Sequence, residues 1–243
     1  MRTFLAAVSF LTIVPVKDGG IPPGRAAIFF PLVGAMIGAA GAGAFLAASF
    51  VLPVSLASLI TVAFWTMISG VLHEDGLADI ADALRAGRTR GKMLAILKDS
   101  RIGTYGAVAL VLSLAVRWQA LQHVPAARIV AVCVIAQSVP RAAMVALAWV
   151  SRPSGEGLGL AFSSSLTTWS ASICIAQGIA VSLLSGWRPA TLIVAGAYLI
   201  VSGARAYFYK RIAGVNGDCL GATEQLVEIF ILLLFASPRI YEL

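Results

Sequence analysis

The residues best suited to chemistry are seven carboxylates gathered in two short segments of a chain with only eleven Asp and Glu residues. The first segment, H-E-D-G-L-A-D-I-A-D-A-L (73–84), carries Glu74, Asp75, Asp79 and Asp82. The second, G-V-N-G-D-C-L-G-A-T-E-Q-L-V-E (214–228), carries Asp218, Glu224 and Glu228. Both segments adjoin apolar runs, and unpaired charges next to lipid are costly. A positive partner must therefore compensate them.

The spacing of three aspartates in the first segment points to a metal. Asp75, Asp79 and Asp82 are separated by four and three residues, so on a helix they share one face, where like charges repel. A divalent cation such as Mg²⁺ takes carboxylate and phosphate oxygens and would relieve this repulsion. Gly76 would let the backbone or a phosphate approach closely. The alternative is a solvated helix end, where Glu74 and Asp75 merely complement the helix N-terminus.

A cationic segment, G-R-T-R-G-K-M-L-A-I-L-K-D-S-R-I-G-T-Y-G (87–106), follows the first acidic cluster directly. Metal-bridged carboxylates beside Lys and Arg are the arrangement that phosphoryl transfer at a pyrophosphate needs. An ordinary cytoplasmic loop would explain the positive charge equally well, but not the two glycines that flank Thr104-Tyr105. We predict that phosphates are bound by Lys98, Arg101 and Arg205, with Asp99 and Ser100 orienting the loop.

Five further residues complete the predicted site. His73 could be a metal ligand, a base or simply a helix-end residue, and Tyr105 could stack on a base or anchor the membrane interface. Arg141 lies within an apolar run, so it must pair with a carboxylate or a phosphate. Asp218 is a candidate second-site ligand or base, with Glu228 behind it. The predicted catalytic residues are Asp79, Asp218 and His73; the predicted metal ligands are Asp75, Asp79, Asp82, Asp218 and Glu228; and Tyr105 and Arg141 join the predicted substrate-binding residues.

The elements that must position these residues are membrane helices. The chain is 59% hydrophobic and 12% charged, with a mean hydropathy of +0.91, whereas a soluble domain carries about 25% charged residues. We predict an all-α, polytopic bundle of six or seven transmembrane helices forming one domain (1–243), with a half-helix or interfacial helix at the N-terminus. The apolar runs cover 27–51, 54–72, 104–121, 127–149, 169–187, 189–205 and 225–236.

Lys and Arg predict the orientation of the bundle. With the N-terminus in the cytoplasm, both acidic clusters and most basic residues fall on the cytoplasmic side, as the positive-inside rule requires. The net charge of +7 then reflects contact with an anionic leaflet of the bacterial inner membrane rather than with nucleic acid. The 13 cytoplasmic cations of the 18 Lys and Arg are Arg2, Lys17, Arg25, Arg85, Arg88, Arg90, Lys92, Lys98, Arg101, Arg152, Arg205, Lys210 and Arg211.

The motif pair H-E-D-G-L-A-D-I-A-D-A-L and L-K-D-S-R-I-G-T-Y-G closely resembles the adenosylcobinamide-GDP ribazoletransferase family, also called cobalamin synthase. F-L-T-I-V-P-V near the N-terminus and G-D-C-L-G-A near the C-terminus are similar too, so the resemblance covers residues 4–228. It implies a Mg²⁺-dependent membrane transferase. Such an enzyme joins adenosylcobinamide-GDP to α-ribazole or its 5′-phosphate, giving adenosylcobalamin or its 5′-phosphate and GMP. Ala83 and Asn216 depart from the expected Gly and Thr.

Two other classes compete with this interpretation. A CDP-alcohol phosphotransferase-like lipid enzyme also places Asp residues on one helix face, but Asp79 stands where that pattern expects Arg. A secondary transporter also carries intramembrane acids, but both clusters lie toward one side and no inverted repeat is visible. The partners expected are the two substrates and the lipid bilayer, and a homo-oligomer is compatible with the sequence.

Overall fold

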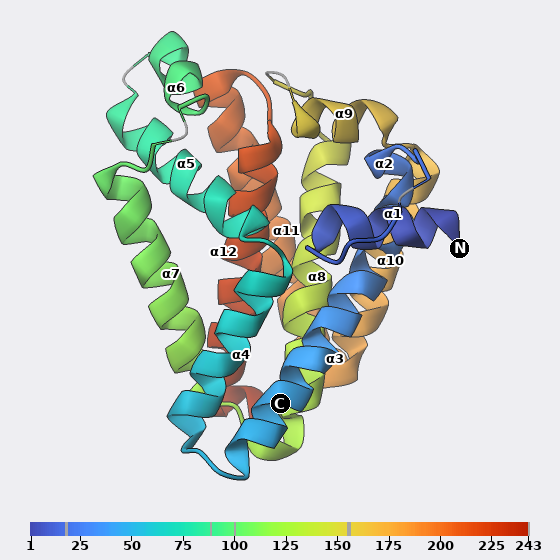
Figure 1. Ribbon diagram of the computed structural model, residues 1–243, viewed down its shortest axis with the longest axis vertical. Coiled ribbons are helices and arrows are strands. Elements are labelled where there is room, and N and C mark those ends of the chain that lie inside the picture. Colours follow the sequence, from blue (N-terminus) through green and yellow to red (C-terminus); the bar gives the residue numbers. More distant parts are fainter. Residues whose placement is uncertain (18, 88, 100, 155–156, 243) are drawn as a thin grey trace.

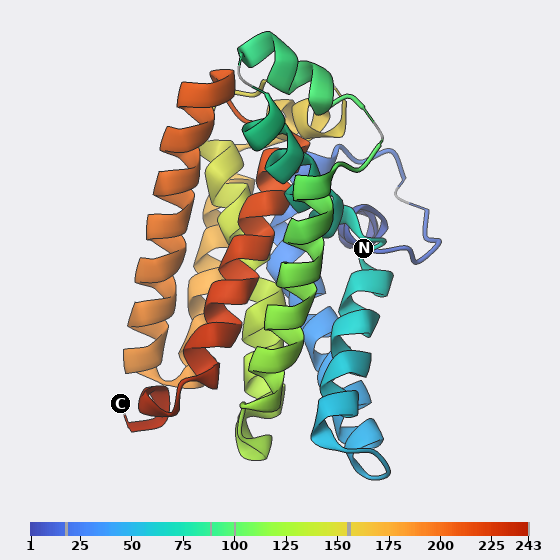
Figure 2. The ribbon, with the colours of Figure 1, turned by 90° about the vertical axis from the view of Figure 1, so that its left-hand side faces the viewer.

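The computed structural model describes residues 1–17, 19–87, 89–99, 101–154 and 157–242. Within them it is a bundle of helices, and the only β-type pairing in these ranges is an isolated bridge between Pro153 and Val215. Six helices there are long and apolar enough to cross a membrane, or seven spans if one bent pair is counted as a span. This confirms the predicted all-α membrane bundle (Figures 1 and 2). The long helices are α3 (Phe30–Ser49), α7 (Thr104–Gln122), α8 (Ile129–Trp149), α10 (Thr168–Ser182), α11 (Trp187–Ile212) and α12 (Gly217–Ala236).

The remaining α-helices are shorter, and all but one of them gather near one end of the bundle. The exception is α4 (Val54–Ile68), which lies in the other half and leads up to α5 (Figure 1). The first, α1, is the predicted short N-terminal helix, and it lies across the long helices rather than along them (Figure 1). The bent pair consists of α4 and α5, whose axes meet at 87°. These elements are α1 (Arg2–Leu11), α2 (Pro23–Ala26), α4 (Val54–Ile68), α5 (Leu72–Ala86), α6 (Arg90–Ile96) and α9 (Leu158–Ser165).

Helix α8 forms the centre of the bundle, and small residues let α3 approach it. Added Cβ atoms on Gly34 and Gly38 would collide with the backbone carbonyls of Gln137 and Cys133, respectively. Lipid tails offer no hydrophobic drive for helix association, so such close backbone packing supplies the contact energy instead. The run of small residues in α3 is therefore a helix-packing surface.

The break between α4 and α5 is a helix stop followed at once by a helix start. Gly70, at φ +63°, donates its N–H to the Met67 carbonyl, while the N–H of Val71 bonds the Thr66 carbonyl. This pair of hydrogen bonds is the Schellman motif, in which a left-handed glycine ends a helix. Val71 is also left-handed, at φ 62°, which is unusual for a β-branched residue. The stop and the 87° turn swing α5, with its acidic residues, across α12.

Helices α5 and α12 cross at two glycines. A Cβ on Gly76 would lie 2.9 Å from the carbonyl oxygen of Asp218, and one on Gly221 would lie 3.3 Å from the Cα of His73. The close approach predicted for Gly76 is therefore made by the backbone of the second acidic segment. Two segments about 140 residues apart in the chain are thus brought into direct contact.

Candidate active site

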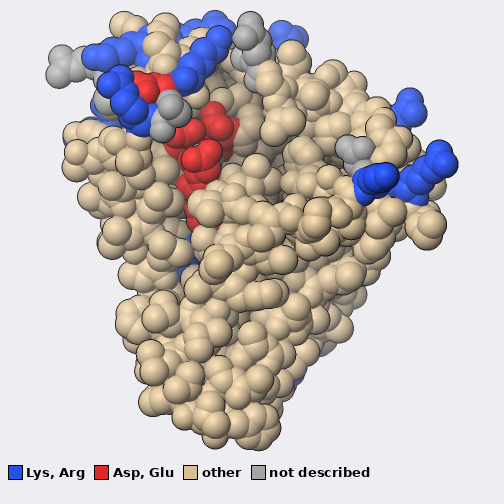
Figure 3. All heavy atoms as spheres, viewed as in Figure 1, with Lys and Arg blue, Asp and Glu red and all other residues tan. Residues whose placement is uncertain are grey.

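A cavity of about 600 Å³ opens at the end of the bundle where the short helices gather. One side is formed by α5 and by the start of α12, and the other by α1, α8 and α9 (Figure 1). Figure 3 shows acidic side chains in a recess at this end, with Lys and Arg around them. The residues that line it include Phe10, His73, Asp75, Lys98, Phe162 and Asp218.

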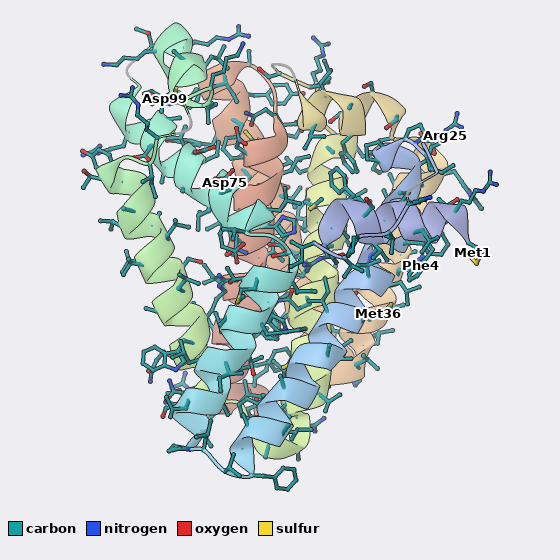
Figure 4. The ribbon with its side chains drawn as sticks, in the orientation of Figure 1. Met1, Phe4, Arg25, Met36, Asp75 and Asp99 are labelled. Atoms are coloured by element: carbon teal, nitrogen blue, oxygen red, sulfur yellow. The ribbon has the colours of Figure 1, made fainter. Side chains whose placement is uncertain are left out.

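The two acidic clusters meet at this cavity. Asp75 is exposed, Asp218 is half-buried, and both line the cavity; Figure 4 labels Asp75 on α5. Asp79, one turn further along α5, lies close enough to Asp75, Asp82 and Asp218 for their charges to interact. Asp75, Asp79 and Asp218 therefore lie close together, and they bring carboxylates from both segments to one place.

Asn216 fixes the position of Asp218. Its side-chain oxygen accepts a hydrogen bond from the N–H of Cys219, which caps α12, and its amide nitrogen donates to Asp218 Oδ2 at 2.7 Å. One amide thus caps the helix and orients the carboxylate. Asn216 stands where the family resemblance leads us to expect Thr, and like Thr it can cap the helix N-terminus.

Asp82 and the G-T-Y-G motif form one structural unit. Asp82 is buried and accepts hydrogen bonds from the N–H groups of Gly103 (2.7 Å) and Gly106 (2.9 Å), at the start of α7. Added Cβ atoms on either glycine would collide with this carboxylate. The two glycines are therefore explained by the close approach of Asp82, and Asp82 satisfies N–H groups that a helix start leaves unpaired.

We expect Asp82→Ala to lower the free energy of unfolding by about 2 kcal/mol, because two backbone donors lose a charged acceptor. Thermal unfolding in detergent measures this. Asp82→Asn keeps one carbonyl acceptor and should cost less. An unchanged melting temperature for Asp82→Ala would contradict the capping role and leave metal binding as the reason for this aspartate.

A buried ionic network lies below the cavity. Arg117, 1% exposed, donates to Glu74 Oε1 at 2.9 Å and to Glu228 Oε1 at 3.3 Å. Gln225 bridges Glu224 and Glu228 through its amide nitrogen. Glu228, which we predicted as a metal ligand, thus lies in the bundle interior against a guanidinium. The sequence did not count Arg117 among the cytoplasmic cations, and its partners on α5 and α12 place it in the bundle interior.

Arg141 and His73 extend the network toward the cavity. Arg141, 1% exposed, pairs with Glu224 at 3.2 Å, so its partner in the structure is a carboxylate. We also predicted that Arg141 binds substrate, but it is not among the residues that line the cavity. His73 is 3% exposed, and its Nε2 lies 3.8 Å from Glu224 Oε1 with no hydrogen-bond partner in the described structure. His73 therefore connects the acids at the cavity to the charges beneath it.

The predicted phosphate-binding residues are distributed more widely. Lys98 lines the cavity. Arg101 is exposed and pairs with Asp99 at 2.7 Å, and these hydrogen bonds lower the pKa of Asp99 to about 2. Arg205 lies elsewhere: its guanidinium donates to the carbonyl of Val150 and sits over the ring of Tyr209. Tyr105 is half exposed at the start of α7, and Ser100 lies outside the described residues.

The donor set at the cavity suits a hard cation. Across the described ranges, no group of three or more His, Cys, Asp or Glu side chains is placed so that it could hold a metal ion by itself. Mg²⁺ commonly binds through one or two carboxylates and completes its shell with water and substrate phosphates. Asp75 and Asp218, which line the cavity from two helices, and Asp79 beside them fit that mode.

Sequence reasoning missed two groups of residues. Arg117 interrupts the run Y-G-A-V-A-L-V-L-S-L-A-V, and a single Arg inside a span is a signal for a buried acidic partner. Phe10 and Phe162 line the cavity from α1 and α9. Nothing in the local sequence distinguishes these aromatics from ordinary core residues.

The comparisons with known proteins confirm the family resemblance seen in the sequence. A family model described as cobalamin-5-phosphate synthase matches residues 3–236. The chain belongs to the cobalamin-5-phosphate synthase family. Proteins named adenosylcobinamide-GDP ribazoletransferase are similar to it: one from Bradyrhizobium diazoefficiens is 39% identical, covering 95% of this chain and 92% of the relative. One from Vibrio parahaemolyticus is 35% identical (96% and 91%), and one from Geotalea daltonii is 33% identical (98% and 98%).

No solved structure matches the chain significantly. Membership of the cobalamin-5-phosphate synthase family therefore rests on the sequence match, which includes both acidic segments and the G-T-Y-G motif.

Proposed function

We propose that this chain transfers ribazole to adenosylcobinamide-GDP in cobalamin synthesis, with Mg²⁺ as cofactor, and that the reaction takes place at the cavity lined by Asp75 and Asp218. The observation that carries the proposal is the meeting of the two acidic segments there, at the Gly76–Gly221 crossing, in a chain of the cobalamin-5-phosphate synthase family. Carboxylates from two helices beside Lys98 suit a pyrophosphate held through a divalent cation.

The bond changes follow from the reactants. A ribose hydroxyl of the ribazole attacks the phosphorus atom that bears the corrinoid, the bond to the second phosphate breaks, and GMP leaves. The family description names a 5-phosphate product, so with a 5′-phosphorylated acceptor this phosphate survives and the attacking hydroxyl is another one on the ribose. The bound Mg²⁺ would neutralise charge on the departing phosphate.

The side chains at the cavity have separate proposed roles in binding the metal, binding the phosphates and accepting the proton. Asp75 and Asp218, which line the cavity, are the proposed Mg²⁺ ligands; Asp79 lies beside them, and Lys98 and Arg101 attract the phosphates. Asp218 and His73 both line the cavity, so either can take the proton of the attacking hydroxyl once it lies within hydrogen-bond reach. Asp82 and Glu228 support the site from behind, through α7 and Arg117.

We propose that the cavity faces the cytoplasm of a bacterial inner membrane. The positive-inside rule favours this orientation, because Lys and Arg gather around the cavity end of the bundle (Figure 3). Both substrates would then enter from the cytoplasm, while the long helices contact lipid.

The deciding experiment uses the purified full chain in liposomes with adenosylcobinamide-GDP, α-ribazole 5′-phosphate and Mg²⁺, and follows GMP and corrinoid product together. We expect both products in equal amounts and their loss with EDTA. If GMP and the corrinoid product still form in the presence of EDTA, the reaction does not require a metal ion. Transfer from a nucleotide-activated lipid instead would favour the lipid phosphotransferase, and uptake of substrate without covalent change would favour transport.

A further inference from the structure

Three phenylalanines form an aromatic wall at the cavity. Phe10 of α1, Phe30 of α3 and Phe162 of α9 have ring centroids 5.4 to 5.8 Å apart in all three pairs, with interplanar angles of 18° to 24°. A linear stack would place its outer rings at about twice the neighbour distance. Three equal separations therefore mean that the rings lie offset beside one another and share an orientation. Together they present one apolar, aromatic surface.

The wall is open to the cavity at one ring. Phe30 and Phe162 are almost fully buried, whereas Phe10 is only partly buried, and Phe10 and Phe162 both line the cavity. The segment just after Phe10 is held at the end of α4, because the N–H of Ile13 donates to the carbonyl of Ile68. Phe10 is the first residue of the motif F-L-T-I-V-P-V. The proposed reaction mechanism assigns no role to this motif.

The size of the cavity limits what can reach this wall. About 600 Å³ suits a ligand of drug or nucleotide size, and a corrin ring with its side chains is far larger. The corrinoid must therefore lie mostly outside, and the cavity takes a nucleoside part of one substrate. The reacting phosphate would lie by Asp75 and Asp218, and the attached base would point toward α1 and α9.

Two bases compete for that place, and the wall discriminates between them. Guanine carries donors and acceptors on its edge that lose free energy when buried without partners. The base of ribazole is a benzimidazole, a flat and largely apolar bicycle. Among the lining residues, Phe10, Phe162, Met144 and Leu158 are apolar. They offer a benzimidazole stacking and apolar contact, and these side chains have no groups that could pair with the polar edge of guanine.

Resting on the proposed function, we infer that the Phe10–Phe162 wall is the subsite for the apolar aromatic base of the ribazole substrate. Aromatic faces favour offset stacking with flat rings, so the wall orients the base while the ribose hydroxyl reaches the phosphate. The residue that determines recognition of this substrate is Phe10, because it is the ring that remains accessible.

The test compares Phe10→Ala with Phe4→Ala in the full chain. Phe4 lies on the same helix and packs edge-to-face on Phe29 at 5.7 Å, and Figure 4 labels it on α1. Its removal also costs aromatic packing on α1, but Phe4 is not among the residues that line the cavity. We expect Phe10→Ala to raise the KM for α-ribazole 5′-phosphate by about tenfold, equivalent to about 1.4 kcal/mol. The KM for adenosylcobinamide-GDP and the kcat should stay near wild type, and Phe4→Ala should leave both KM values unchanged.

Other outcomes overturn the inference. If Phe10→Ala raises only the KM for adenosylcobinamide-GDP, the base that contacts the wall is guanine. If neither KM changes, the three phenylalanines serve only to pack the core. If Phe10→Ala does not fold, Phe10→Leu and Phe10→Tyr replace it: the first should weaken ribazole binding and the second should retain it. Calorimetric binding of α-ribazole to the wild type and these variants needs no turnover. Wild-type protein that binds α-ribazole through Phe10 but forms no product would overturn the proposed function and leave the subsite standing.

Discussion

Replacing Arg117 by methionine is expected to lower the free energy of unfolding by about 3–5 kcal/mol, the cost typical of breaking a buried ion pair. Its guanidinium is 1% exposed and is shared by Glu74 and Glu228, themselves both 2% exposed. Removing it leaves two carboxylates in the bundle interior without their cation. Three buried free cysteines, Cys133, Cys174 and Cys219, permit a direct measurement, since a thiol-reactive dye reports their exposure during thermal unfolding in detergent.

The control for Arg117→Met is Arg101→Met. Arg101 also makes an ion pair, with Asp99 at 2.7 Å, but its side chain is 86% exposed, and pairs at the surface contribute little to stability. Adding Glu74→Gln and Glu228→Gln to Arg117→Met should restore part of the loss, since the uncompensated charges are then gone. A melting temperature for Arg117→Met equal to that of Arg101→Met would show that the buried network does not stabilise the bundle.

Asp75→Asn and Asp218→Asn are each expected to lower kcat by about 10²–10³-fold, the loss typical when one group that stabilises transition-state charge is removed. Each substitution preserves side-chain size and removes only the charge that would hold Mg²⁺ at the cavity. The melting temperature of Asp75→Asn should stay close to wild type, because Asp75 is exposed. Steady-state GMP release measures kcat, and the Mg²⁺ concentration giving half-maximal rate should rise in both variants.

Asp99→Asn separates a local effect from a general loss of negative charge. Asp99 lies near the same end of the bundle (Figure 4), where it pairs with Arg101 rather than lining the cavity. We expect a much smaller loss of kcat and an unchanged Mg²⁺ requirement. Equal losses in Asp99→Asn and Asp75→Asn would contradict a metal site on the α5 face, and full activity in Asp75→Asn would remove that residue from the site.

The sequence by itself determined the membrane bundle and most of its spans. Hydropathy depends on composition over about twenty residues, so the predicted runs 104–121 and 127–149 differ by only a few residues from α7 and from the span Ala126–Trp149. The predicted end of the apolar run 54–72 is less accurate. Helix α4 ends at Ile68, because the Schellman turn at Gly70, and not the start of the polar residues, ends the helix. The short run 225–236 proved to be the second half of α12, which begins at Gly217.

The tertiary structure alone decided which of the predicted site residues share the cavity. The i, i+4, i+7 spacing places Asp75, Asp79 and Asp82 on one face, but it cannot show that Asp82 caps α7 through Gly103 and Gly106. Nor can it show that Glu228 meets Arg117, because the two are 111 residues apart. Local spacing fixes which side chains share a helix face. Contacts between helices depend on where small residues such as Gly76 and Gly221 let two backbones cross, and only the packed bundle determines that.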